Sequence, residues 1–326
     1  MKKSIIISGK HFSSHSSSIL SSAKGPVSIP LTNDYLFRAF LQKNNQALKG
    51  LICSLLHLSV NDITSVEITN PIELGEYINE KTYFLDVRLL LNNKTIINLE
   101  MQVINEHNWP ERSLTYLCRS FDNLNAGDTY QNVKSAIQIG LLDFTLFPDH
   151  PEFYATYKLL NVKNYSLYSD KVQLSVVDLT HIHLATEEDK LYQIDYWASL
   201  FKAITWEEIK MLASKNEFIQ EASETIYQLS QKEQVRLQCE AREDYYRRLR
   251  STQLTIEENK ATLERQNSEI ERQNSEIERQ FSEIERQNSE IERQNSEIEK
   301  QAAIIQQKDS AYNDLLQWAI KHGYEA

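Results

Sequence analysis

The feature that most constrains this chain is a seven-residue repeat in its last third. From residue 264 the unit Glu-Arg-Gln-Asn-Ser-Glu-Ile recurs, and branched apolar residues stand seven positions apart. In this phase lie Leu249, Ile256, Leu263, Ile270, Ile277, Ile284, Ile291, Ile298 and Ile305. Three residues before the isoleucines of the repeat lie Asn267, Asn274, Phe281, Asn288, Asn295 and Ala302. Alternating spacings of three and four predict a coiled-coil seam, with Asn at position a and Ile at position d.

This seam predicts a partner for the segment 251–326. Buried Asn at position a favours parallel dimers at a cost in stability, so we expect a weak homodimer through a parallel C-terminal coiled coil. Half of the seam is polar, however, so two alternatives to the coiled coil stay open. They are a solvated single helix and a disordered, low-complexity run.

Composition bounds the remaining possibilities. A length of 326 residues predicts roughly two domains at about 150 residues each. The net charge is −11 with no basic tail or stripe, so any nucleic-acid role must rest on a local patch or a bound metal. No apolar run approaches the roughly 18 residues of a membrane span. The three scattered cysteines form no disulfide framework, which fits a reducing cytosol and predicts a cytoplasmic protein.

The chain divides by pattern into four parts. Residues 1–30 are serine-rich, carry no secretion signal and are expected to form a flexible tail. Residues 31–203 predict a mixed α/β domain, residues 204–250 a helical region, and residues 251–326 the heptad-repeat coil with a C-terminal helix. In the α/β part we expect helices over 31–41, 45–58 and 110–125, the last with Leu114, Leu117 and Phe121 facing inward, and strands over 66–69, 81–91, 95–103, 133–147, 153–160 and 172–179.

Two acidic residues fall on neighbouring predicted strands. Asp86 lies within one strand and Glu100 near the end of the next, and Asn92 and Asn93 form a tight turn between the two strands. Carboxylates that converge there repel each other, and a divalent cation removes that repulsion. Oxygen ligands suit Mg²⁺, with Mn²⁺ as a second possibility. The alternative is that Asp86 lies at the rim of the sheet and pairs with a neighbouring Arg88 or Lys81.

The order of short motifs resembles a known family. The quoted motifs are Asp34-x-x-Phe37-Arg38, then Asp86 followed fourteen residues later by Glu100-Met101-Gln102, then Trp109, Arg112, Tyr116, Gly127 and Tyr130. Together they resemble the Rpn family of recombination-promoting nucleases and transposases, within the PD-(D/E)xK nuclease superfamily. The resemblance covers about residues 31–250. It implies a restriction-endonuclease-like α/β fold, with a mixed central sheet flanked by helices, ahead of the C-terminal coil.

The resemblance also implies roles for individual residues. Asp86 and Glu100 would be metal ligands, and these two residues with Gln102 would form the catalytic core. Gln102 stands where the superfamily usually has Lys, and it can hydrogen-bond water but carries no charge. Glu-x-Gln is common within this family, so the departure does not exclude activity.

Other residues are candidates for binding the substrate. Arg112, Tyr116 and Arg119 share one helix face and are expected to contact the scissile phosphate, unless they form surface ion pairs around one packed aromatic ring. Asp34 and Glu67 are possible additional acids of the site. Asp34 is alternatively only a helix cap.

The predicted function is a Mg²⁺-dependent DNA endonuclease, recombination-promoting or transposase-related. Water activated at Asp86 and Glu100 would attack a backbone phosphate and leave a 3′-hydroxyl and a 5′-phosphate. The coil would pair two subunits for two cuts on one duplex. A catalytically weak or inactive descendant that acts as a DNA-binding or oligomerising scaffold is the alternative. A third reading, an RNA-cleaving or toxin-like nuclease, would use the same site.

Overall fold

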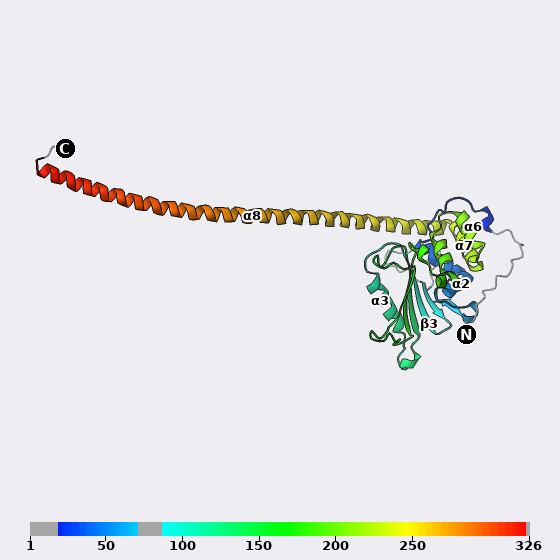
Figure 1. The fold of residues 1–326 in the computed structure, drawn as a ribbon. Coiled ribbons are helices and arrows are strands. Elements are labelled where there is room, and N and C mark those ends of the chain that lie inside the picture. The colour runs from blue at the N-terminus through cyan, green and yellow to red at the C-terminus, as the bar shows by residue number, and fades with distance from the viewer. Residues whose placement is uncertain (1–18, 71–86, 324–326) are drawn as a thin grey trace. The chain divides into compact units, whose positions relative to one another are not determined.

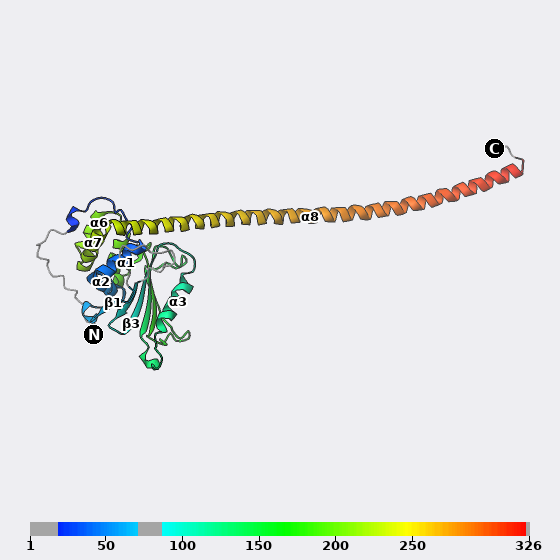
Figure 2. The same cartoon turned by 180° about the vertical axis from the view of Figure 1, so that it is seen from behind.

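The computed structural model describes residues 19–70 and 87–323, and Figures 1 and 2 show its ribbon from opposite sides. The chain divides into two compact units, of which the first ends at Arg250 and the second begins at Ser251. The helical region 204–250 therefore belongs to the same unit as the α/β part. The longest element is α8 (Glu233–Lys321), a continuous helix of 89 residues.

The helices and strands of the first unit alternate along the chain. The α-helices that precede α8 are α1 (Asp34–Lys43), α2 (Asn45–Leu55), α3 (Trp109–Phe121), α4 (Glu187–Leu191), α5 (Ile194–Lys202), α6 (Trp206–Ala213) and α7 (Glu217–Ser230). The strands are β1 (Val66–Ile68), β2 (Val87–Leu91), β3 (Thr95–Gln102), β4 (Ser135–Leu142), β5 (Tyr154–Tyr157) and β6 (Val172–Asp178). Short 3₁₀ turns are η1 (Ile19–Ser22), η2 (Val60–Asp62), η3 (Tyr130–Asn132) and η4 (Ile182–Leu184).

The described strands form one mixed sheet in the order β1-β2-β3-β4-β6-β5. β3, β4 and β6 are parallel, and the other pairs are antiparallel. The expected turn at Asn92 and Asn93 joins β2 to β3, and both residues have the positive φ that such a turn requires. Because the three central strands are parallel, their carboxyl ends lie at one edge of the sheet, where sites in open α/β sheets usually form.

Helices cover both faces of the sheet, and the two faces differ in character. Figure 2 shows α3 alone on one face and α1 and α2 on the other, with α6 and α7 beyond them. The α1 side holds the main apolar core, in which Phe37, Phe40 and Phe201 pack edge to face. The α3 side has a small cluster around Trp109. The predicted restriction-endonuclease-like arrangement, a mixed sheet between helices, is confirmed.

Two expectations differ from the structure. Residues 19–30, predicted as part of a flexible tail, are folded: Leu20, Ala23 and Ile29 are buried, and Val27 N donates to Ile204 O at 2.8 Å. A few apolar residues next to the serines suffice to attach this segment. On α3, Leu114 was expected to face inward but is exposed, because the helix turns Trp109, Ser113 and Leu117 toward the sheet instead.

No helix in the described ranges 19–70 and 87–323 is both long and apolar enough to cross a bilayer.

The contact between α3 and the sheet depends on a glycine. A Cβ added at Gly140 on β4 would lie 2.1 Å from Cζ2 of Trp109. We expect Gly140→Ala to lower the free energy of unfolding by about 1–3 kcal/mol, because the ring has no space to retreat. Urea denaturation of the full chain measures this value.

The matched background for that variant is Trp109→Leu, which removes the ring. There, Gly140→Ala should be neutral or slightly stabilising, because Ala loses less backbone entropy than Gly in a strand. An equal cost in both backgrounds would contradict the proposed contact.

Candidate active site

The site begins with the alternation of side chains on β3. Ile97, Leu99 and Met101 point into the main core, and the intervening Asn98, Glu100 and Gln102 point to the α3 face. Glu100 is only 5% exposed. A carboxylate at this depth requires a charged or hydrogen-bonding partner to offset its desolvation.

Arg112 supplies that partner from the first turn of α3. Its Nη2 lies 2.6 Å from Glu100 Oε1, and its Nη1 lies 3.4 Å from Oε2 of Glu106 on the loop after β3. The guanidinium also lies over the ring of Tyr116, with 5.6 Å from Cζ to the ring centroid. Packing of Trp109 against the sheet fixes the start of α3, and so it places Arg112 over the carboxyl end of β3.

A second buried carboxylate faces this pair from α1. Asn33 caps the helix by accepting a hydrogen bond from Leu36 N, which leaves Asp34 as the first helical residue. Both Asp34 oxygens accept hydrogen bonds from Arg242 of α8: Nε lies 3.0 Å from Oδ1, and Nη2 bonds Oδ2. The alternative in which Asp34 is only a helix cap is therefore wrong, because Asn33 takes that place.

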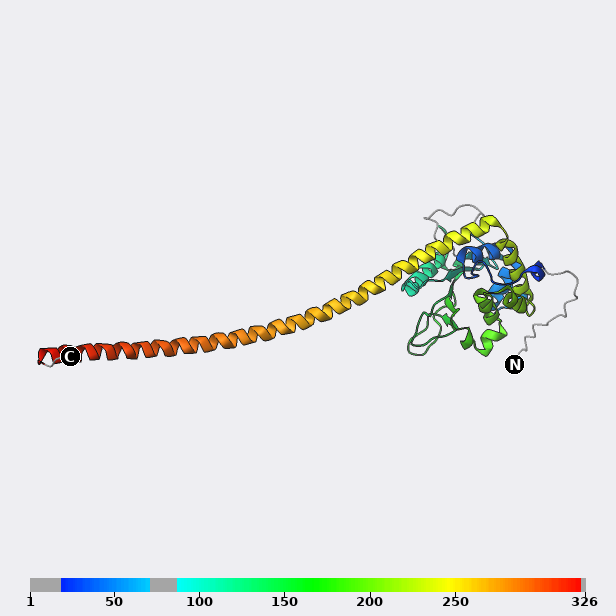
Figure 3. The same cartoon turned by 90° about the horizontal axis from the view of Figure 1, so that it is seen from above.

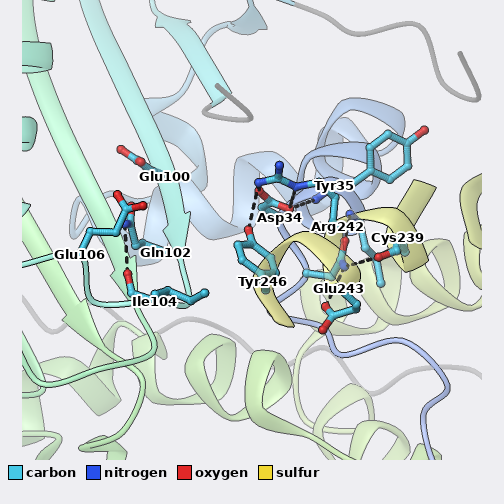
Figure 4. A network of polar contacts seen from close by, with 12 residues as sticks. Asp34, Tyr35, Glu100, Gln102, Ile104, Glu106, Cys239, Arg242, Glu243 and Tyr246 are labelled. Atoms are coloured by element: carbon cyan, nitrogen blue, oxygen red, sulfur yellow. Dashed lines mark hydrogen bonds and ion pairs between the residues drawn. The ribbon is translucent and has the colours of Figure 1, made fainter. Parts of the chain in front are cut away.

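Arg242 is held on every side. Its Nη2 donates to the hydroxyl of Tyr246 at 3.2 Å, and its guanidinium stacks on the rings of Tyr245 and Tyr246. Figure 4 shows Asp34, Arg242 and Tyr246 together, across from Glu100 and Gln102. Figure 3 shows α1, in blue, beside the yellow start of α8. Asn33 reinforces this contact, since its Nδ2 donates to Cys239 O at 3.1 Å.

Burial and charge shift the pKa values of this cluster. Burial lowers the pKa of Arg242, but the hydrogen bond and the charge of Asp34 outweigh it, and the net pKa is raised. Burial raises the pKa of Tyr246, with the Asp34 charge adding to the rise and Arg242 opposing it. Burial also raises the pKa of Cys239 to about 12. At neutral pH the arginine is therefore charged, and the tyrosine and the thiol are protonated.

These groups enclose a pocket of about 120 Å³, which has room for several water molecules. It is lined by Asp34, Glu100, Met101, Gln102, Val103, Ile104, Glu106, Arg112, Tyr116, Arg242, Tyr245, Tyr246 and Leu249. Three carboxylates and two arginines carry the charge of this lining. The pocket is thus polar, slightly acidic and closed on one side by α8.

Five of the predicted site residues meet in this pocket: Asp34, Glu100, Gln102, Arg112 and Tyr116. Gln102 donates from Nε2 to Ile104 O at 3.2 Å. The alternative of surface ion pairs around a packed ring does not describe Arg112, whose carboxylate partner is buried.

Three predicted residues are not among those that line the pocket. Asp86 lies outside the described residues, next to Val87, which pairs with Leu99. Arg119 lies one helical turn beyond the pocket, 6.0 Å from the ring of Tyr116. Glu67 is exposed on β1, whose register places it near the level of Ile96, at the other end of β3 from the pocket.

The short motifs do not predict that α8 contributes to the pocket. Position 242 is in phase with Leu249 and the isoleucines of the repeat, and position 246 is in phase with the Asn residues at position a. Within the first unit the same stripe is buried, at Val235, Cys239 and Tyr246. Arg242 at a seam position, close to Tyr245 and Tyr246, indicates that this part of the stripe packs against a charged partner and not against an apolar helix.

The donors of the pocket fit a hard divalent cation in chemistry. Carboxylate and amide oxygens are present from Glu100, Gln102 and Asp34, and no His or Cys is among the described residues that line the pocket. Within ranges 19–70 and 87–323, no group of three His, Cys, Asp or Glu residues is placed to hold a metal. A ligand set that includes Asp86 lies partly outside these ranges.

A family model described as PD-(D/E)XK nuclease family transposase matches residues 31–253. The chain belongs to this family. The match spans the sheet, all the elements that line the pocket and the first turns of α8, and it confirms the resemblance drawn from the motifs. The mixed sheet flanked by helices is accordingly a PD-(D/E)XK nuclease fold. No curated protein and no solved structure matches the chain significantly.

The Asp34–Arg242 pair can be tested through stability. Both side chains are largely buried, with 8% and 13% exposed. We expect Arg242→Met to lower the free energy of unfolding by about 3–5 kcal/mol, because it leaves the Asp34 charge buried without its partner. Adding Asp34→Asn should recover part of the loss. Urea denaturation of each full-length variant gives the values.

The matched control is Arg247→Met on the same helix. Arg247 pairs with Asp244, but both side chains are mostly exposed. Its loss should cost no more than about 1 kcal/mol. Equal costs for the two arginine variants would show that the buried pair has no special part in holding α1 to α8.

Proposed function

We propose that this chain is a Mg²⁺-dependent endonuclease that hydrolyses backbone phosphodiesters of DNA, in a recombination-promoting or transposase-related role. The observation that carries the proposal is the buried Glu100 at the carboxyl end of β3, which shares a pocket with Arg112, Gln102 and Asp34 in a PD-(D/E)XK family chain. Acids and an arginine gathered at one strand end fit phosphodiester chemistry better than a purely structural role.

Asp86 and Glu100 would hold the cation, Mg²⁺ or Mn²⁺. When bound, it would supply a water of lowered pKa and neutralise charge that builds up on the phosphate. The place of Asp86 in this set rests on the sequence motif. Arg112 forms an ion pair with Glu100 in the structure, so it would orient the carboxylate before the cation binds.

The remaining residues of the site would bind and orient. Gln102 would hydrogen-bond the attacking water, without the charge that a lysine would bring. Arg112 offers a planar fork to the scissile phosphate, and its Nε has no partner among the described residues. Tyr116 and Arg119 continue the same face of α3 and would contact the next phosphate along the strand.

A catalytically weak or inactive scaffold is the second candidate. Gln102 favours it, because no lysine is among the described residues that line the pocket. The ion pairs favour it as well, since both arginines of the pocket already neutralise carboxylates. An RNA-cleaving or toxin-like enzyme would use the same site on another substrate.

Plasmid nicking decides between the enzyme and the scaffold. With Mg²⁺, we expect the full chain to nick supercoiled DNA, and Glu100→Gln or Asp86→Ala to slow nicking by on the order of 100-fold, because each removes an anionic ligand. Gel densitometry of the open-circular product gives the rate, and the same assay on a structured RNA tests the third candidate.

The control variant is Glu111→Gln, which changes an exposed acid in the same turn of α3 as Arg112. It should nick at the wild-type rate. Mn²⁺ binding, followed by the electron paramagnetic resonance signal of the free ion, should weaken in Glu100→Gln and in Asp86→Ala, and it should be unchanged in Glu111→Gln. If the wild type nicks no faster than Asp86→Ala, the proposed nuclease activity is wrong. If the wild type binds no Mn²⁺, the scaffold is favoured.

We further propose that α8 forms a parallel homodimer beyond Arg250. Six isoleucines at position d are each more than half exposed on the single chain, which is unfavourable in water. The opposite face carries ion pairs of 2.8–3.0 Å between Glu269 and Arg272, Glu283 and Arg286, and Glu290 and Arg293. An apolar stripe opposite a charged one is the pattern of a paired helix.

Sedimentation equilibrium tests this pairing. Ile277→Lys with Ile284→Lys should convert a dimer into a monomer, because two seam positions would then bury charge. Arg279→Ala with Arg286→Ala, on the outer face, should leave the dimer intact. A wild type that is monomeric at all concentrations would refute the coil.

Orientation is tested separately with a cysteine at the seam. In a Cys118→Ser background, which removes the exposed thiol, Ile298→Cys should form a disulfide between two copies under mild oxidation. Equivalent residues of a parallel pair lie side by side, and in an antiparallel pair aligned end to end they lie far apart. A dimer that does not crosslink would be antiparallel.

A further inference from the structure

The end of the sheet opposite the pocket carries the most exposed apolar side chains of the described chain. Tyr130 is 90% exposed, Val162 88%, Tyr168 85% and Tyr165 76%, more than any other large apolar residue in the described ranges. Side chains this exposed add nothing to the core. Four of them at one end of a domain indicate a binding surface.

Three segments build this surface at the amino ends of β3, β4 and β6. They are the turn 92–94, the connection 122–134 and the hairpin 158–171. Hydrogen bonds join them: Ser135 N donates to Lys94 O at 3.2 Å, and Lys171 Nζ donates to Val133 O at 3.2 Å. The hairpin closes on itself through a bond from Tyr168 N to Leu159 O at 2.9 Å. We call it the tyrosine–lysine surface.

Its charge is opposite in sign to that of the chain. The three segments contain five lysines, Lys94, Lys134, Lys158, Lys163 and Lys171, and three aspartates, Asp122, Asp128 and Asp170, for a local balance of +2 against −11 overall. Among the described residues, none of these lysines forms an ion pair with a carboxylate, and Lys94, Lys158 and Lys163 are exposed. The surface therefore suits an anionic partner.

α3 links the pocket to this surface. Its first turn holds Arg112 over Glu100, and just past its last turn the side chain of Asn123 bonds the backbone of Lys134 in both directions, at 3.2 and 3.0 Å. The helix has 13 residues, or about 20 Å at 1.5 Å each. A single strand that keeps its bases stacked, at the rise of about 3.4 Å per nucleotide, covers that distance in about six nucleotides. Tyr116 and Arg119 lie along the way.

We infer that the tyrosine–lysine surface binds an unpaired stretch of the DNA strand, about six nucleotides from the phosphate that is cut. This rests on the proposed nuclease function. Tyr130, Tyr165 and Tyr168 would stack on bases, and the lysines would neutralise phosphates between them. Stacking of this kind needs unpaired bases, since the rings of a duplex are covered by their neighbours.

Charge and position favour nucleic acid over the other occupants of such a surface. A lipid interface also attracts tyrosine and lysine, but it offers no reason for a track of Arg112, Tyr116 and Arg119 that leads away from a polar pocket. A protein partner of acidic character would not require three separate, nearly free aromatic rings. Both remain measurable outcomes of the test below.

The test is fluorescence anisotropy of labelled oligothymidines of 6, 12 and 20 nucleotides with the full chain, in EDTA to prevent cleavage. We expect the 12-mer to bind markedly tighter than the 6-mer, because only the longer strand reaches from pocket to surface. Tyr165→Ser with Tyr168→Ser should weaken the 12-mer by roughly tenfold or more and remove the gain with length. Lys158→Gln with Lys163→Gln should lower the salt dependence by about one phosphate contact or more.

The matched control is Trp318→Ser, which removes an exposed aromatic ring of α8 outside the seam phase. This variant should still bind the 12-mer more tightly than the 6-mer. Melting temperatures equal to wild type establish that the exposed substitutions leave the fold intact. Binding and nicking by wild type with an unchanged length gain in the double tyrosine variant would overturn this inference alone. No binding of any oligonucleotide, with no nicking, would overturn the proposed function too. Tighter binding to a duplex of equal length, to anionic phosphatidylserine vesicles, or only to a protein would also reject the inference.

Discussion

The site depends on two buried carboxylates that are each held by an arginine from a helix. Glu100 is tied to Arg112 of α3, and Asp34 to Arg242 of α8. Burying an unpaired carboxylate at this depth would cost desolvation free energy, and each arginine offsets part of that cost. The two ion pairs place four charged groups next to the main apolar core of the domain. They also hold α3 against β3 and α8 against α1, so that these elements line the same pocket.

One stripe of α8 packs against the domain over its first turns and is exposed over the later ones. Its seam positions from Val235 to Tyr246 are filled by the domain, Leu249 lines the pocket, and the same phase is exposed from Ile256 onward. A second helix could therefore pair with α8 only beyond the domain, because the earlier turns are already occupied. In the proposed dimer, the pocket wall and the pairing seam would be formed by consecutive turns of one helix, and a change of phase near residue 249 would affect both.

The sequence predicted the fold well where one physical pattern was decisive. The strand pair joined at Asn92 and Asn93 and the buried run of β4 followed from turn chemistry and from apolar periodicity. Element ends were less certain, as in the expected strand 133–147, which is β4 at 135–142, because apolar residues continue into loops that pack on the sheet. The folded segment 19–30 was missed because composition alone does not reveal the few side chains that find a place against α6 and α7.

The residues inside short motifs could be placed near one another from sequence, and the residue contributed by a distant helix could not. Glu100, Gln102, Arg112 and Tyr116 lie within sixteen positions of one another, so strand and helix periods place them together. Arg242 is 208 residues from Asp34, and no local rule connects the two. Only the fold brings them together, through Asn33, which caps α1 with its oxygen and holds α8 with its nitrogen. Because Asn33 caps α1 and also bonds α8, the neighbouring Asp34 is not needed as the cap. Its carboxylate lines the pocket.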